Sequence, residues 1–210
     1  MLAARALDSL VKTRYGDSLA VVEWHPYVLD TFNINPDDSL RIARYQHNPG
    51  QPSLVLDGYL QVAMPSDPSE YYGTFDAAIR TVKSSATFVA LTATGEADTV
   101  EGRVIVTLAM DSVTTGSTPT LYCVVTEDSL LDPLGGAYFR IPARFLPDRN
   151  GTSVSLARGD TLVDTLTFAT AGYRLDKLGA AVFVEDARGT EEHRVLQSAT
   201  ISRFVLTEEK

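Results

Sequence analysis

Cysteine is nearly absent from this sequence. Cys123 is the one thiol among 210 residues, which excludes an internal disulfide, a Cys-x-x-Cys pair and a cysteine-rich zinc site within this chain. It lies in an alternating apolar stretch that predicts a strand, and no neighbour in sequence would lower the pKa of its thiol. We therefore expect Cys123 to behave as a small buried hydrophobe.

Positive charge and long apolar runs are scarce as well. Eighteen Lys and Arg residues face 27 Asp and Glu residues, and the formal net charge is −9. This balance argues against nucleic acid or an anionic membrane as the main partner. No apolar run approaches the ~20 residues that a membrane-spanning helix needs. Met1–Leu7 lacks the pattern of a secretory signal, so the start predicts a cytosolic protein or a chain without its native beginning.

Helical and strand patterns alternate in the first 86 residues. Apolar residues at helical spacing predict a helix over 2–15, and the apolar run 19–24 predicts a buried strand with parallel pairing. Two Asn/Asp-Pro starts followed by acidic residues predict further helices, one from 35 to about 45 and one from 67 to about 85.

A proline-led hairpin lies between these two later helices. Asp57-Gly58 separates two short apolar runs and predicts a two-residue turn, because both turn positions need φ > 0. Pro52 precedes the first of these strands, where a cis peptide bond could expose backbone groups. Gly50–Pro52 is thus a candidate site, with an ordinary strand entry as the alternative interpretation.

From Thr87 onward, threonine and valine dominate and apolar residues alternate with period two. Turn signals separate roughly eight strands, a pattern typical of an antiparallel Ig-like β-sandwich. The predicted strands cover residues 87–94, 103–110, 121–125, 139–145, 152–157, 161–169, 180–186 and 194–205.

One weak polar cluster is visible in the sequence. Glu23 and His25 lie two residues apart at the end of the strand predicted at 19–24, so they would share a face, and His47 near the hairpin could join them. An acid–base or metal role competes with a plain polar cluster at a strand end. The histidines lack ligand spacing, so no metal site is predicted.

Acidic pairs could in principle offer calcium ligands. They occur at Asp37-Asp38, Glu185-Asp186 and Glu191-Glu192, but no Asp-x-Asp-x-Asp-Gly loop accompanies them. We interpret the first pair as acids in the first turn of a helix and the other two as a solvated hairpin. No cofactor is expected.

The order helix, strand, helix, proline-led hairpin, helix is that of the thioredoxin fold without its first strand. Several segments, in their order and spacing, resemble the Omp28-related outer-membrane protein family, and the resemblance covers nearly all of the chain. These segments are Arg5–Leu10, Tyr15–His25, Leu146–Asp148, Asn150–Ser153, Val182–Asp186 and Val195–Ala199.

The resemblance implies an α+β protein with two parts. Residues 1–86 would be an incomplete thioredoxin-like α/β domain, and 87–210 an antiparallel Ig-like β-sandwich. Pro52 would occupy the cis-proline position, and the first strand with its Cys-x-x-Cys would fall upstream of Met1. The strands at 19–24 and 53–57 would then lack their central neighbour. Upstream sequence could supply it, the two strands could pair directly, or another segment or subunit could donate a strand.

The resemblance also implies a location outside the cytoplasm, in the periplasm, in the outer membrane or secreted. We expect a non-catalytic structural or protein-interaction protein with a redox-dead thioredoxin-like domain, for which strand addition is one route of assembly. A protein partner or self-assembly would fit this function. The alternative is a thiol–disulfide oxidoreductase whose Cys-x-x-Cys lies upstream of this chain.

Overall fold

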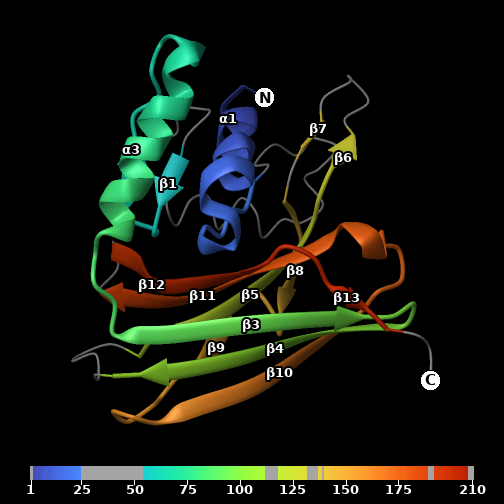
Figure 1. Ribbon diagram of the computed structural model, residues 1–210. Helices are drawn as coiled ribbons and strands as arrows, with labels where there is room; N and C mark the ends of the chain where they lie inside the picture. The colour runs from blue at the N-terminus through green and yellow to red at the C-terminus, as the bar shows by residue number, and fades with distance from the viewer. Residues whose placement is uncertain are drawn as a thin grey trace.

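The protein is a mixed α+β structure made mostly of strands. The computed structural model describes residues 2–24, 54–111, 118–131, 137–138, 140–188 and 192–207. Within them, two α-helices stand on one side of a pair of β-sheets (Figure 1). No helix in these ranges is long and apolar enough to cross a membrane.

Helices and a short hairpin make up the first part. Helix α1 (Leu2–Leu10) continues as a π-helical turn, η1 (Val11–Tyr15), and a 3-10 turn, η2 (Gly16–Ser18). The hairpin consists of β1 (Leu54–Leu56) and β2 (Leu60–Val62). A 3-10 turn, η3 (Pro68–Glu70), then leads into helix α3 (Tyr71–Lys83).

Strands make up the rest, with one further 3-10 turn, η4 (Leu175–Lys177). The strands are β3 (Val89–Ala97), β4 (Glu101–Met110), β5 (Thr120–Glu127), β6 (Leu130–Leu131), β7 (Ala137–Tyr138), β8 (Ile141–Leu146), β9 (Thr152–Ser153), β10 (Thr161–Ala169), β11 (Leu178–Arg188), β12 (Glu192–Ile201) and β13 (Val205–Leu206).

The first part has a small core of its own. Leu10 of α1, Leu56 and Val62 of the hairpin, and Phe75 and Ile79 of α3 are buried together. Phe75 and Ile79 lie one turn apart on α3, and the partly buried Ala3, Ala6 and Leu7 lie on α1 with Leu10, so each helix turns one apolar face inward. Asp67 caps η3, the 3-10 turn that leads into α3: its Oδ1 accepts the Ser69 N–H at 2.9 Å, and Pro68 follows it.

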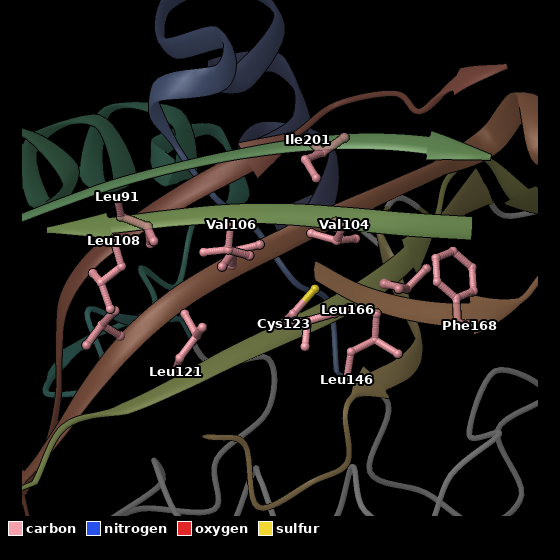
Figure 2. Close-up of a cluster of buried hydrophobic side chains, with 14 of the residues drawn as sticks. Leu91, Val104, Val106, Leu108, Leu121, Cys123, Leu146, Leu166, Phe168 and Ile201 are labelled. Carbon is pink, nitrogen blue, oxygen red and sulfur yellow. The ribbon is translucent and has the colours of Figure 1, made fainter. Parts of the chain in front are cut away.

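Two larger sheets carry the strand order β10-β4-β3-β13 and β12-β11-β5-β8, with β9 paired to β5. All described pairs in these sheets are antiparallel except the short parallel pair of β13 with β3. The facing sides of the two sheets share one core. Val104 and Val106 of β4 and Cys123 of β5 belong to it (Figure 2). Val182 of β11 belongs to it as well.

The five-stranded sheet is also covered on its other side. Tyr122, Val124, Phe145 and Phe183 point away from the shared core and form a second cluster with Val22 and Trp24 of the first part. The ring of Trp24 stacks on Phe145 with centroids 5.6 Å apart. This sheet is therefore the middle layer, between the four-stranded sheet and the helical part (Figure 1).

The predicted helices over 2–15 and from 67 are confirmed, and the helix predicted at 35–45 lies outside the described residues. The positive φ angles predicted for the hairpin turn are present, at 47° for Asp57 and 75° for Gly58. Tyr59 donates its N–H to Leu56 O at 3.2 Å. Leu56 pairs with Leu60, so the connection has three residues and the predicted two-residue loop is wrong.

The strand predicted at 19–24 is also wrong, as is its parallel pairing. This segment joins no ladder within the described residues, where β1 pairs antiparallel with β2. Instead the Glu23 N–H donates to Arg140 O at 3.2 Å, and the Arg140 guanidinium donates to Leu19 O at 3.4 Å. The apolar run thus lies on the face of the five-stranded sheet, and burial against that face explains its composition.

We predict opposite effects for two glycine-to-alanine changes. A Cβ on Gly102 would overlap the ring of Phe168 in the shared core, whereas a Cβ on the helical Gly73 would meet no atom within 4 Å. Gly102→Ala should lower the free energy of unfolding by about 1–3 kcal/mol. Gly73→Ala should raise it by about 0.5–1 kcal/mol. Urea unfolding measures both, and equal effects would contradict the packing described for β4.

Candidate functional site

The structure separates the residues that the sequence groups together. Pro52, His25 and His47 lie outside the described residues, so their predicted roles stay predictions. Glu23 is described, and its backbone N–H binds Arg140 O on the stretch before β8. A cis X-Pro peptide bond occurs at Leu146–Pro147.

The lone thiol lies in the middle of the shared core. Cys123 is 0% exposed, and burial raises the pKa of its thiol to about 12. The thiolate is the reactive form of cysteine, and burial makes it less accessible here. Burial therefore disfavours the reactive form of Cys123.

The hairpin turn is docked on β12. The Val195 N–H donates to Asp57 O at 2.8 Å, and the Arg194 guanidinium lies 5.2 Å from the centre of the Tyr59 ring. Burial raises the pKa of the Asp57 carboxyl, and the nearby Arg194 and Lys83 charges oppose that shift. The described part of the hairpin therefore serves as a contact between the helical part and the middle sheet.

A buried carboxylate lies close to this contact. Glu185 is 1% exposed and Asp186 is 0% exposed, which makes the interpretation of this pair as a solvated hairpin wrong. The Glu185 Oε1 lies 3.2 Å from His193 Nδ1, and the His193 side chain is 15% exposed. A protonated His193 would form an ion pair that offsets part of the cost of burying the carboxylate. Within the described ranges, no three His, Cys, Asp or Glu side chains gather in a way that could hold a metal ion.

A second ionic cluster joins the π-helical turn to α3, and sequence reasoning missed it. Asp76 is 4% exposed; its Oδ1 accepts from Tyr15 Oη at 2.6 Å, and its Oδ2 accepts from Arg14 at 2.8 Å and also from Arg80. The hydrogen bonds from Arg80 and then Tyr15 hold the pKa of this carboxyl below its usual value. Only the Asp76–Arg80 spacing of four residues is visible in the sequence.

We predict that Asp76→Asn lowers the melting temperature at neutral pH. The folded-state pKa of Asp76 is lowered, so its stabilisation is present above the unfolded pKa and is lost as the pH falls through the folded pKa. The gap between wild type and variant should therefore shrink below about pH 4.

Melting curves from neutral to acidic pH test this dependence. Asp8→Asn is the matched control, because it removes one carboxylate from an ion pair with the exposed Lys12; an exposed pair of this kind contributes little. A gap that is constant across the whole range would contradict the role given to the Asp76 charge.

The described sheets also offer one long strand edge. Strand β10 pairs with β4 along all nine of its residues without a register shift, and within the described ranges no strand pairs with its other side. Its outward side chains are uncharged: Thr161, Val163, Thr165, Thr167 and Ala169 are exposed. A long unpaired edge of this kind is a template for pairing with another chain. It is the candidate interaction site of the described structure.

Comparison with solved structures places this architecture among known folds. HBP35 of Porphyromonas gingivalis matches with a TM-score of 0.66 and 12% sequence identity, over 82% of this chain and 59% of HBP35. The chain shares its fold with HBP35. The AGR_C_4864 protein of Agrobacterium tumefaciens matches with a TM-score of 0.60 and 14% identity, over 100% of this chain and 90% of that one.

A domain of the outer membrane lipoprotein Omp28 from P. gingivalis also matches, with a TM-score of 0.40 and 15% identity, over 59% of this chain and 93% of that domain. No family model and no curated protein matches the sequence. At these identities the comparisons speak to the fold alone, and this chain spans 59% of the length of HBP35.

Proposed function

We propose that this chain is a non-catalytic protein-interaction protein of the Omp28-related family that acts outside the cytoplasm. In this proposal, residues 1–86 are a redox-dead thioredoxin-like domain and residues 87–210 are an Ig-like β-sandwich. The family and the location rest on the sequence segments that resemble that family. The likeness of the fold to HBP35 supports the architecture.

The burial of Cys123 carries the redox-dead part of the proposal. A dithiol oxidoreductase needs two thiols that can exchange, of which the attacking one is accessible as a thiolate. This chain has one cysteine, and that cysteine has no exposure and a strongly raised pKa. Thiol chemistry by these residues would require the shared core to open.

The free side of β10 supports the interaction part. Strand addition supplies affinity through main-chain hydrogen bonds and needs an open edge of sufficient length. Among the other outer strands, β13 has only two residues and β12 is contacted along its outer side, where the Val195 N–H donates to Asp57 O at 2.8 Å. Thr87 Oγ1 also donates to Leu196 O of β12 at 2.8 Å.

We predict that this chain does not catalyse the reduction of insulin by dithiothreitol. Turbidity should develop at the rate of dithiothreitol alone, for the wild type and for Cys123→Ala alike, because the thiol cannot reach a substrate. Catalysis by the wild type that Cys123→Ala abolishes would overturn the proposal.

Titration with an aromatic disulfide reagent supplies the matching control for burial. Cys123 should stay unmodified in the native protein and react fully in concentrated guanidinium chloride. Rapid reaction of the native protein would show that the core opens readily and would contradict the state described for Cys123.

A further inference from the structure

One residue, Asp164, makes the open edge of β10 different from an uncharged edge that any strand could pair with. The strand alternates, with exposed residues on one side and Leu162, Asp164, Leu166 and Phe168 on the other. Leu166 and Phe168 are buried in the shared core and Leu162 packs against it, as Figure 2 shows for the first two. Asp164 is thus a carboxylate on the inward face of an edge strand, where it is only partly covered.

The Asp164 carboxylate accepts a hydrogen bond from a backbone N–H in the middle of the strand. Its Oδ1 accepts the Thr165 N–H at 2.8 Å. In an antiparallel ladder, alternate residues direct their N–H and C=O groups to the same neighbour. A Thr165 N–H that binds its own neighbour's carboxylate belongs to the set directed away from β4. Thr161, Val163, Thr165 and Thr167 therefore present the edge that an added strand would meet.

A second copy of this chain fits the edge poorly. Two copies related by two-fold symmetry would pair β10 with β10 antiparallel. With Thr165 opposite Thr165, Asp164 faces Leu166 of the copy, and the two Asp164 side chains are diagonal neighbours, about 7–8 Å apart. Each copy also carries a net charge of −9. Like charges at the contact and over the whole surface oppose this pairing.

We propose, as a deepening of the proposed interaction function and resting on it, that β10 accepts an extended segment of a different protein. In that segment a Lys or Arg side chain lies directly across from Asp164, on the same face of the sheet. Small or β-branched residues flank the Lys or Arg. Its cation replaces the Thr165 N–H as the partner of the carboxylate, and the freed N–H joins the new ladder. Asp164 opposes pairing with a second copy, as inward charges on edge strands do, and its charge favours a basic segment over an acidic one.

The test uses two fluorescein-labelled peptides and the full chain. One is Thr-Val-Thr-Lys-Thr-Val-Thr, acetylated and amidated, and the other has Glu in place of Lys. Fluorescence anisotropy should give a dissociation constant for the Lys peptide at least about tenfold lower than for the Glu peptide. Asp164→Asn should reduce this preference to about twofold or less.

Asp17→Asn is the matched control, because it removes the same charge from the exposed turn η2 and should leave the preference intact. Thr165→Pro should abolish binding of the Lys peptide, because it removes a donor on the open side while a proline is tolerated on an edge strand. Hydrogen exchange should show protection at Val163 and Thr167 on binding. If Thr165→Pro fails to fold, Asp164→Asn and the exchange data still decide.

Sedimentation tests the rejection of a second copy. The wild type should not associate through β10, and Asp164→Asn should associate more strongly. A wild type that associates and loses this association with Thr165→Pro would overturn the proposal, as would equal binding of the two peptides. If either result occurs while the chain still fails to reduce insulin, the assignment of the β10 edge is wrong but the redox-dead function still holds. Insulin reduction that depends on Cys123 would instead contradict the proposed redox-dead function.

Discussion

Burial of the five-stranded sheet on both faces is the constraint on which the rest of the structure depends. Cys123, Val125 and Val182 point into the core shared with the four-stranded sheet. Tyr122, Val124 and Phe183, their neighbours in sequence, point to the helical side. Complete burial of one such side chain stabilises the fold by about 1.5–3 kcal/mol. Loss of the packing on either face would therefore be strongly destabilising. The helical part and the outer sheet are held in place by one pair of central strands.

Local signals predicted the elements that depend on neighbours in sequence. Capping by Asp67 and Pro68 predicted the start of the helix that became α3, and strict alternation predicted β4 and β10 within a few residues. The apolar run at 19–24 misled, because a buried strand and a segment lying flat on a sheet bury similar side chains. Its contacts with Arg140 and with the cluster on the sheet face, both far along the chain, decide between them.

The candidate sites were harder to predict because their partners are distant in sequence. Asp76 has Arg80 within its own helix, but Tyr15 and Arg14 reach it from more than sixty residues away. Glu185 and Asp186 look like ordinary hairpin acids in the sequence, yet the fold buries both of them. Conversely, the burial of Cys123 followed from its apolar neighbours alone, since no tertiary contact was needed to infer an inert thiol.

The double-sided burial of β5 and β11 has a consequence for strand register. Where one face of a sheet is exposed to solvent, a slip by one residue would bring apolar side chains to the solvent side, and this fixes the register. Here both faces are apolar, so polarity does not fix the register. Volume distinguishes them instead. Tyr122 lies opposite Phe183 with ring centroids 5.4 Å apart on the helical side, while Cys123 lies opposite Val182 on the side of the outer sheet. A slip would drive a tyrosine into the space of a cysteine, so the alignment of these strands is encoded in side-chain size.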